Sequence, residues 1–572
     1  MGELKKTFGA GLAVLIILLL APYYLQLIGY TQEADATAIS ENTEASETLV
    51  KQKNSLVDLI KPEKKEEGFK APINNSVNSK QIFTVETPLY TSQISSLGGG
   101  SFNSYSLNGY HGAWLDDVYV DSLKVELLSD SGEGCAPCVG VSGMDPDKNY
   151  NFDCSFSGWA DKKNFSLEQN ESVELVCRLV VGNTEVVKTT FFSGSSFVIN
   201  HHISQSGGDR LTPYLTWDRG INNTEKNLYD DISYSGVSVS YNKEIETLSF
   251  IPSSPSDKLE NRDSYSGAID WAAIRNKYFI VAMVPESPVG LANLDGNTKQ
   301  FTNKEFSPVY SVLLSGAGAS QNMSINTYFG PLDIDNINQL ETTLDRIMNF
   351  GWFVIQPFSR GILWLLKFFH SFGINYGIIL ILFAFLVRFI TGPLTKKSFE
   401  STQKMQAIQP QLKKLQEKYK NDSQKLNTEM VKMYKENGVN PLGGCFPMLL
   451  QMPLLFALFM VFRSTIEFRG APFFWWIKDL SLPDTIFNLP FYIPIYGDQI
   501  AFLPILLGVS MFLTQKMSMA NMEGGMGQQK YMMYFMSAFF FLIFNSFPSG
   551  LNLYYLVYNI LNYLQQKSLK KV

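Results

Sequence analysis

Five long apolar runs crowd into the last two hundred residues and constrain the fold more than any other feature of the chain. They cover residues 377–390, 442–462, 500–515, 531–547 and 551–564. A helix crosses the bilayer with about twenty apolar residues. Several of these runs are shorter or more polar, which indicates local bilayer thinning or mutual shielding. Charged residues are 17% of the chain, below the usual quarter. The sequence therefore predicts a helical membrane core.

A sixth apolar run, at residues 8–30, carries no charge. Lys5 and Lys6 precede it and Glu33 follows it, so the positive-inside rule places the N-terminus in the cytoplasm. A cleaved signal peptide is the alternative, because residues 34–36 read Ala-Asp-Ala. The run is longer than a typical signal core, which favours an uncleaved anchor.

The region between the anchor and the core has two parts that differ in residue composition and pattern. Residues 31–80 are polar and poor in aromatics, so they predict a tether that cannot bury enough apolar area to fold alone. Residues 81–338 instead alternate apolar and polar residues in short stretches, separated by Gly, Asn, Asp, Ser and Pro. This pattern is typical of strands and turns and predicts a large external all-β double-layer sandwich.

Four cysteines lie close together in this predicted β region: Cys135, Cys138, Cys154 and Cys177. In an exported region they can form two disulfides, with three possible pairings. The Cys-x-x-Cys spacing of the first two is also found in redox motifs and in half of a zinc site. No second Cys-x-x-Cys or His pair follows, which favours structural disulfides and predicts no metal.

An amphipathic segment at residues 339–372 separates the β region from the core. Apolar residues recur in it at helical spacing, Trp352 and Trp364 are interleaved, and Arg360 and Lys367 lie on other faces. Such a helix is typical of a membrane surface. The alternative is an ordinary packed helix.

The loop at residues 395–441 is strongly basic. Between residues 396 and 440 it has ten lysines against five acids, so it is predicted to be cytoplasmic. Helical spacing on both sides of Asn421-Asp422 predicts an antiparallel hairpin. The hairpin is either a docking arm or a solvated positive-inside loop. The candidate docking residues are Lys413, Lys414, Lys418 and Lys420. The other loops agree with six spans and two cytoplasmic termini.

One arginine, Arg388, lies inside a predicted span. Its insertion costs about 2.5–3.5 kcal/mol, so it is a functional candidate by default. It could instead snorkel to the inner head groups. No acid lies inside another span to pair with it, so its charge would need water or polar groups. Polar residues on other spans that could line such a cavity are Gln451, Thr514, Gln515, Asn545, Asn552, Tyr554, Tyr555 and Asn559.

The chain lacks the motifs of several other protein classes. It has no GxxxxGK[ST] phosphate loop and no evident Ser/His/Asp set, so the sequence predicts a protein that is not an enzyme and needs no cofactor. A transporter would predict inverted repeats and intramembrane acids, which are absent. A sugar-binding or sugar-converting β module remains a rival, since Trp217, Trp271, Asp218 and Asp270 permit a cleft.

Four segments resemble the YidC-type bacterial membrane protein insertases of the YidC/Oxa/Alb superfamily: VRFITGPLTKKS, NPLGGCFPMLLQMPLLFALF, FRGAPFFWWIKDLS and FNSFPSGLNLYYLVYN. The resemblance implies a five-helix core with a hydrophilic groove, in which Arg388 is the groove arginine and Tyr555 a groove aromatic. It also implies a β-supersandwich that insertion can largely do without. Family members often carry Thr one turn before the arginine, where this chain has Ala384.

The resemblance also implies the partners and the location. The partners would be nascent membrane proteins, the Sec translocon, the ribosome or signal-recognition machinery at the hairpin, and lipids, without nucleic-acid specificity. The location would be the bacterial inner membrane, with the large domain in the periplasm. The groove residues expected from spans and resemblance together are Arg388, Gln451, Thr514, Asn552, Tyr554 and Tyr555. The expected parts are an anchor at 1–30, a tether at 31–80, a β-supersandwich at 81–338, an interfacial helix at 339–372, a five-span core at 373–566 and a short basic tail at 567–572.

Overall fold

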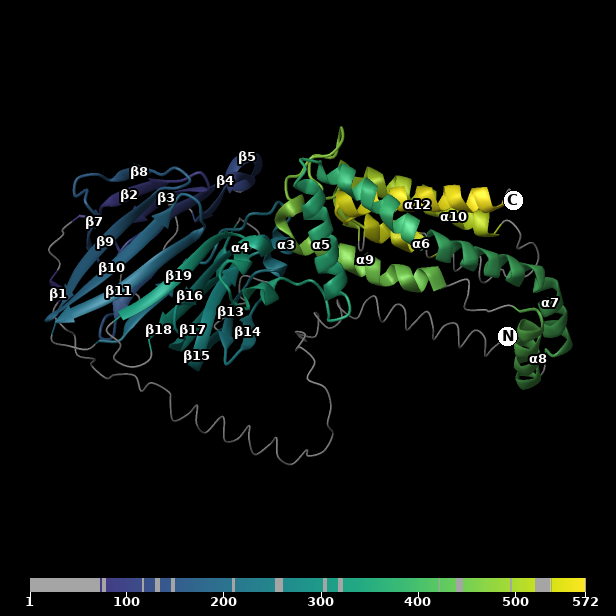
Figure 1. The fold of residues 1–572 in the computed structure, drawn as a ribbon, viewed down its shortest axis with the longest axis horizontal. Helices are drawn as coiled ribbons and strands as arrows, with labels where there is room; N and C mark the ends of the chain where they lie inside the picture. Colours follow the sequence, from purple (N-terminus) through teal and green to yellow (C-terminus); the bar gives the residue numbers. More distant parts are fainter. Residues whose placement is uncertain are drawn as a thin grey trace, which may run out of the picture. The chain divides into compact units, whose positions relative to one another are not determined.

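The computed structural model describes most of the chain beyond residue 72 (Figure 1). The described ranges are 73–74, 79–115, 118–128, 134–145, 150–207, 211–252, 261–301, 306–316, 322–420, 422–438, 446–493, 496–519, 535 and 538–570. Residues 69–572 belong to one compact unit. The predicted anchor at 1–30 and nearly all of the predicted tether lie outside the described residues, as do the first residues of the predicted third and fifth spans.

Two sheets, one of fourteen strands and one of five, make up most of the described region before residue 332, and their strands pair antiparallel except for one pair in the smaller sheet. The larger sheet contains β1 (Ile73–Asn74), β6 (Cys138–Val141), β7 (Asp153–Phe156), β9 (Ser172–Val181), β10 (Thr184–Ser193), β11 (Val198–Gly207), β12 (Pro213–Trp217), β13 (Gly236–Tyr241), β14 (Glu244–Leu248), β15 (Asn261–Arg275), β16 (Phe279–Pro285), β17 (Val289–Gln300), β18 (Phe306–Ser315) and β19 (Asn322–Pro331). The smaller sheet contains β2 (Ile82–Glu86), β3 (Tyr90–Ser95), β4 (Ser101–Leu115), β5 (Val118–Leu128) and β8 (Asn164–Ser166), of which β8 joins β2 in parallel.

The order of the larger sheet is β1-β9-β10-β11-β19-β16-β15-β17-β18-β12-β6, with β13 and β14 branching from β15 and β7 from β9. Side-chain alternation sets its register. On β9, Leu175, Cys177 and Leu179 are buried and their neighbours are more exposed, so every second residue faces the core. Val181 pairs with Thr184 across a two-residue turn, where Gly182 has a φ of +62°, a conformation that glycine adopts without strain. The all-β texture of the sequence thus corresponds to a large β-sheet region.

An aromatic core joins the two sheets. Tyr105 from β4 lies against Phe329 from β19, with ring centroids 4.3 Å apart, and its hydroxyl donates to the Phe329 carbonyl at 2.9 Å. Phe102 and Trp217 pack around the same pair. Burying such large rings is a main source of stability in a sandwich, so the sheets form a single folded body.

Helices dominate the chain after the sheets. They are α4 (Ile334–Asn338), the 3-10 turn η1 (Leu344–Ile347), α5 (Gln356–His370), α6 (Tyr376–Ala407), α7 (Gln409–Lys418), α8 (Ser423–Glu436), α9 (Phe446–Ser464), the 3-10 turn η2 (Ile466–Phe468), α10 (Phe502–Met519) and α12 (Ser549–Lys570). A short α3 (Leu228–Ser233) lies within the β region, and residues 538–544 are also helical. A two-stranded hairpin of β20 (Thr485–Ile493) and β21 (Gly497–Ala501) precedes α10.

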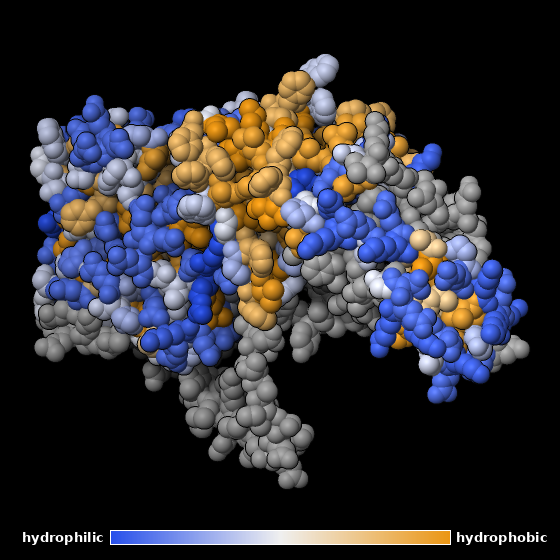
Figure 2. All heavy atoms as spheres, turned by 45° about the vertical axis from the view of Figure 1, so that its right-hand side comes forward, coloured by the Kyte–Doolittle hydropathy of each residue, from blue (hydrophilic) through white to orange (hydrophobic). Residues whose placement is uncertain are grey.

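Length and composition distinguish the helices that could cross a bilayer. Among the described residues one helix is long and apolar enough, Tyr376–Met405, and two shorter apolar helices cover Gln451–Ser464 and Phe502–Lys516. Figure 2 shows hydrophobic residues spread over this helical part, between the mostly hydrophilic β region and the hydrophilic α7–α8 hairpin. An exposed apolar surface of this kind is typical of contact with lipid.

The amphipathic segment before the core forms a shorter helix than the sequence predicts. Only α5 is α-helical, and its Ile362, Leu363 and Leu366 are buried while Trp364 is 65% exposed. Its basic side chains are paired within the chain. The Nζ of Lys367 lies 2.5 Å from a carboxylate oxygen of Asp335 in α4 and 3.0 Å from one of Asp333, the N-cap residue of α4. It also lies 3.2 Å from a carboxylate oxygen of Glu467 in η2. An outward aromatic face therefore remains for the membrane, whereas the Lys367 charge is taken up by protein acids.

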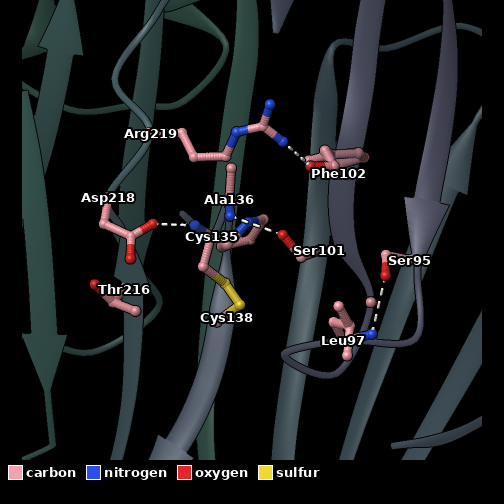
Figure 3. Close-up of a disulfide and its surroundings, with 12 residues drawn as sticks. Ser95, Leu97, Ser101, Phe102, Cys135, Ala136, Cys138, Thr216, Asp218 and Arg219 are labelled. Atoms are coloured by element: carbon pink, nitrogen blue, oxygen red, sulfur yellow. Dashed lines mark hydrogen bonds between the residues drawn. A yellow bond between two sulfur atoms is a disulfide. The ribbon is translucent and has the colours of Figure 1, made fainter. Parts of the chain in front are cut away.

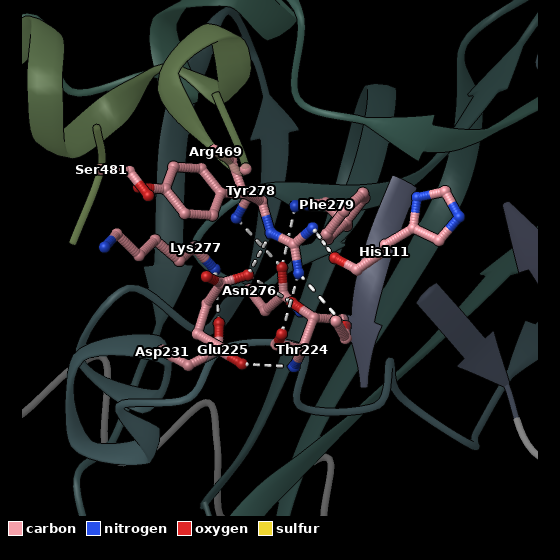
Figure 4. Close-up of polar contacts among 12 residues, drawn as sticks. His111, Thr224, Glu225, Asp231, Asn276, Lys277, Tyr278, Phe279, Arg469 and Ser481 are labelled. Atoms are coloured by element: carbon pink, nitrogen blue, oxygen red, sulfur yellow. Dashed lines mark hydrogen bonds and ion pairs between the residues drawn. The ribbon is translucent and has the colours of Figure 1, made fainter. Parts of the chain in front are cut away.

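Ion pairs join the β region to the helices, and Figure 4 shows the buried one, between Arg469 and Glu225. Arg469, just after η2, donates to Glu225 at 2.7 Å, and the two side chains are 4% and 5% exposed. Arg469 also donates to the carbonyls of His111, Gly112 and Thr224. Six residues earlier, in the last turn of α9, Arg463 contacts Asp230 at 2.5 Å, and these side chains are 30% and 18% exposed. The β region is thus fastened to the end of α9 and the loop after it by one deeply buried ion pair and one partly exposed pair.

Removing one partner of a buried ion pair lowers the free energy of unfolding far more than removing one partner of an exposed ion pair. Glu225→Ala is expected to lower the free energy of unfolding by about 3–5 kcal/mol, because Arg469 keeps its charge without its acid. The control is Asp295→Ala, whose partner Arg262 is 73% exposed and which should cost about 0–1 kcal/mol. Thermal unfolding of the full-length protein in detergent measures both. Equal shifts of the two variants would contradict a buried, structural pair.

Asp231, beside this cluster, makes stability depend on pH. It accepts hydrogen bonds from the backbone N–H groups of Thr224 and Lys277. Burial, followed by the charge of Glu225, raises the pKa of Asp231 from 3.8 to about 7. Because the folded-state pKa is the higher one, this group's stabilisation is complete below pH 4 and is lost as the pH rises to about 7.

We therefore expect the stability of Asp231→Asn to increase relative to that of the wild type as the pH rises. The Tm of each protein is measured from pH 5 to pH 8. The expected result is a difference in Tm that moves in favour of the variant over this range. A difference that stays constant with pH would show that Asp231 does not titrate there.

Candidate functional site

Arg388 lies in the middle of α6 and points into the helical bundle. It is 7% exposed, and Ala384, one turn earlier on the same face, is fully buried. On the adjoining face of α6, Phe385 and Phe389 are 51% and 83% exposed. The helical period therefore gives α6 one face toward its neighbours and one toward its surroundings, and the arginine is on the inner face.

The guanidinium of Arg388 has two neighbours. The ring of Tyr558 on α12 lies 5.6 Å from its central carbon, within the range of a cation–π contact. Its Nη1 donates to Thr395 Oγ1 at 3.4 Å, seven residues further along α6. The side chain thus leans toward the α7 end of the helix while remaining buried.

Part of the guanidinium has no protein partner. Neither Nε nor Nη2 finds an acceptor among the described residues, although both atoms are buried. An arginine carries five N–H donors, and a buried donor left unpaired costs about 1–3 kcal/mol, more when it is charged. The position of Ala384 adds to this deficit, because a methyl group accepts no hydrogen bond. Water or a polar group from another molecule would be needed to complete these hydrogen bonds.

A second group of polar atoms continues along α12. Tyr554 stacks on Tyr558 with ring centroids 6.0 Å apart, and Tyr555 contacts Tyr554 edge-on. Gln451 on α9 lies near both tyrosine hydroxyls. The two hydroxyls and Gln451 Nε2 are buried without a hydrogen-bond partner in the described part of the chain. Arg388, Gln451, Tyr554 and Tyr555 are thus brought into one cluster of incompletely satisfied polar groups.

Two expected groove residues make other contacts. Thr514 Oγ1 donates to the Ser510 carbonyl of its own helix, α10, at 2.9 Å. Asn552, in the first turn of α12, donates to the carbonyls of Phe544 and Phe547 at 3.1 and 3.2 Å. Six residues, or about 9 Å of helix, separate Asn552 from Tyr558. Asn552 thereby joins the ends of two neighbouring helical segments.

Sequence reasoning missed the two nearest neighbours of Arg388. Tyr558 follows Tyr554 by four residues and therefore shares its helix face, which was the available signal. Thr395 follows Arg388 by seven residues, or two turns. Both positions could have been found by extending the helical period from residues already singled out.

The basic hairpin forms as an exposed pair of short helices. Asp422 caps α8 by accepting from Lys425 N at 3.0 Å, and Gly438 after its end has a φ of +61°. Lys414, Lys418 and Lys420 are exposed, while the Lys413 side chain lies outside the described residues. The small core of the hairpin contains buried Ile408 and Leu412 with Met405, Met430, Met433 and Tyr434 packed against them. The lysines are thus presented on the surface of a weakly packed unit.

The structure pairs Cys135 with Cys138 (Figure 3), and Cys154 with Cys177. Cys135 and Cys138 are 1% and 7% exposed. Around them Asp218 accepts from Cys135 N, and Ser101 Oγ accepts from Ala136 N at 2.8 Å. Burial on this scale denies a dissolved thiol access to the sulfur atoms. Among the described residues no three His, Cys, Asp or Glu side chains gather to hold a metal.

Comparison with known proteins covers nearly all of the described chain. A family described as "60Kd inner membrane protein" matches residues 367–572, and one described as "YidC periplasmic domain" matches residues 82–365. The boundary between them falls in α5. The chain therefore combines a periplasmic domain with an inner-membrane domain.

Two curated relatives share 31–38% sequence identity with this chain over most of its length. "Membrane protein insertase YidC" of Chlorobium phaeovibrioides is 38% identical over 84% of this chain and 82% of its own. The protein of the same name from Chloroherpeton thalassium is 31% identical over 97% of this chain and 94% of its own.

Solved structures show weaker likenesses. A crystal structure of an active YidC insertase covers 91% of this chain and 98% of its own, at 16% identity and a TM-score of 0.34. A putative aldose 1-epimerase from Escherichia coli K12 covers 44% of this chain and 100% of its own, at 9% identity and a TM-score of 0.24. It is the sequence relatives, together with the two family matches, that place this chain in the YidC family of membrane protein insertases.

Proposed function

We propose that this insertase lowers the barrier for moving a polar protein flank across the inner membrane, through a hydrated cluster around Arg388. The observation that supports the proposal is the buried guanidinium whose Nε and Nη2 have no acceptor among the described residues. Such donors would bind water in the resting state and a carboxylate or carbonyl of a passing substrate. Gln451, Tyr554 and Tyr555 would continue this polar path, and Thr514 and Asn552 would border it.

The energy would come from the substrate itself. Apolar residues gain about 0.3–0.6 kcal/mol each at the centre of a span, so a twenty-residue segment gains on the order of 10 kcal/mol. The obstacle is the polar flank, which must cross a dry layer. Water held partway into the bilayer shortens that layer, and Arg388 attracts acidic flanks transiently. The membrane potential adds about 2.3 kcal/mol per charge per 100 mV for an acidic tail moving outward.

The topology proposed for this mechanism has six spans and both termini in the cytoplasm. The charge balance supports this topology. The loop that contains α7 and α8 has five more lysines than acidic residues, and positively charged loops stay on the cytoplasmic side of the membrane. The exposed Lys414, Lys418 and Lys420 on this side would meet the ribosome, signal-recognition machinery or anionic lipids. Lys413 would belong to the same surface. Work beside the Sec translocon is part of the proposal, whereas sequence-specific nucleic-acid binding is not.

No covalent step is needed in this mechanism, so the protein is proposed to act without enzymatic chemistry. The rival is a sugar-converting β domain. Deleting residues 31–335 separates the two functions, because an insertase would keep its activity and a sugar enzyme would lose it. The deletion would leave Arg463 and Arg469 facing water, where a charge needs no partner.

Arg388→Ala is expected to slow insertion of a substrate with an acidic external tail by about ten-fold or more, since it removes a contact worth at least about 1.4 kcal/mol. Arg388→Lys should retain most activity because the charge remains. Insertion into proteoliposomes, scored by protease protection of the tail, measures each variant. Arg262→Ala, at an exposed arginine near the start of β15, is the matched control. Wild-type rates for Arg388→Ala across several substrates would exclude an essential role for the arginine.

Tyr558 tests whether the ring positions the guanidinium. Tyr558→Phe keeps the aromatic face and is expected to preserve insertion. Tyr558→Leu removes it and should reduce insertion by up to about thirty-fold, since a desolvated cation–π contact is worth about 2 kcal/mol. The same protease-protection assay applies. If Phe and Leu variants behave alike, the ring does not act through its π face.

A further inference from the structure

The β20–β21 hairpin exposes large apolar side chains on a segment with almost no charge. Ile486 is 54% exposed, and Phe487 and Phe491 are each 59% exposed. Asp498 is the single charged residue between Thr485 and Ala501. A soluble loop would normally place polar residues at such positions, so an exposed group of this kind marks a contact with another apolar phase.

The hairpin is attached firmly rather than hanging free. Asn545, which is fully buried, donates to the carbonyls of Tyr496 and Gln499 at 2.8 and 2.6 Å and accepts from Ala501 N at 3.0 Å. One side chain thereby satisfies three backbone groups of the hairpin. Asn545 follows the helical residues 538–544, so the hairpin is fixed to the end of a helix of the core.

Other contacts place the hairpin at the end of the core that faces the β region. α10 starts at Phe502, directly after β21, and Asp484, just before β20, accepts from Leu503 N at 2.8 Å. The loop before it is joined to the start of α6, where Asn375 donates to the Pro472 carbonyl at 2.7 Å. In Figure 1 the hairpin is the yellow-green pair beside the ends of these helices.

Exposed aromatics continue the apolar surface beside the hairpin. Phe474 and Trp475 are 59% and 87% exposed, and Phe473 next to them packs so closely on Gly377 of α6 that a Cβ there would lie 2.0 Å from its ring. Phe372, in the turn before α6, is 66% exposed. Aromatic side chains gather at the level of the lipid head groups in membrane proteins.

We infer that the β20–β21 hairpin inserts Ile486, Phe487 and Phe491 into the head-group boundary of the outer leaflet. The occupant is the lipid surface because the exposed side chains continue directly from the ends of membrane helices. The described hairpin carries no basic residue, so binding draws on buried apolar area and is independent of anionic lipid. This inference rests on the proposed membrane placement of α6 and α10.

Spin-label accessibility tests the inference in the full-length protein. Cys445→Ser removes the cysteine outside the two disulfides, and Phe487→Cys or Phe491→Cys then carries a nitroxide in nanodiscs of zwitterionic phosphatidylcholine. Two controls accompany them: Tyr229→Cys on α3, where the native side chain is 66% exposed, and Phe389→Cys on α6, where it is 83% exposed. Collisions with oxygen report lipid, and collisions with a neutral nickel chelate report water.

The expected result is an oxygen-to-nickel accessibility ratio at 487 and 491 that lies near that of 389 and several-fold above that of 229. A ratio equal to that of 229 would overturn the inference, and so would low access to both reagents, which indicates a protein partner such as a second copy. If the ratio is lipid-like at position 389 but water-like at position 487, only the lipid contact of the hairpin is rejected. If the ratio at position 389 is itself water-like, the membrane placement on which the proposed function also depends is rejected.

Discussion

The ion pair between Arg469 and Glu225 fixes how the two halves of this protein meet. Both side chains are nearly inaccessible, and three backbone carbonyls complete the arginine's hydrogen bonds. A buried pair of this kind contributes little net stability but makes any other arrangement expensive, because separating the partners leaves charges without solvent. The pair therefore acts mainly as a device of specificity, which holds the β region in one orientation on the loop after α9.

Arg388 is the counterpart of Arg469 in the membrane core. Arg469 has one acid and three backbone carbonyls as acceptors. Arg388 instead has a tyrosine face, one threonine and two donor nitrogens without an acceptor among the described residues. The same residue type is thus satisfied where it holds the structure together and incomplete where a substrate is proposed to pass. Selection for stability alone would favour an apolar residue at position 388.

The sequence foretold the large β-sheet region and the helical hairpin, because hydrophobic period and charge encode them directly. From the residues alone Arg388 stayed open between snorkelling and a function, and its place in a groove was what the family resemblance implied. It did not foretell that Lys367 pairs with Asp333, Asp335 and Glu467, since those acids lie far away in the chain. The β20–β21 hairpin was also missed, because Pro490 interrupts its apolar run and an extended apolar segment between two helices reads as a loop. Tyr558 was missed although its helical period was available. The β region thus followed from local pattern, while the contacts of the site depended on tertiary placement.

α6 is longer than a bilayer requires. Its 32 residues extend about 48 Å, against roughly 30 Å of hydrocarbon. Pro393 inside it has no N–H to offer the carbonyl of Phe389, which weakens the helix one turn beyond Arg388. Arg388 therefore lies before this weakened point in α6, and the α7–α8 hairpin follows after it. A force on the α7–α8 hairpin would reach the guanidinium through this part of α6, and the stiffness of the helix at Pro393 would set how much of that force arrives.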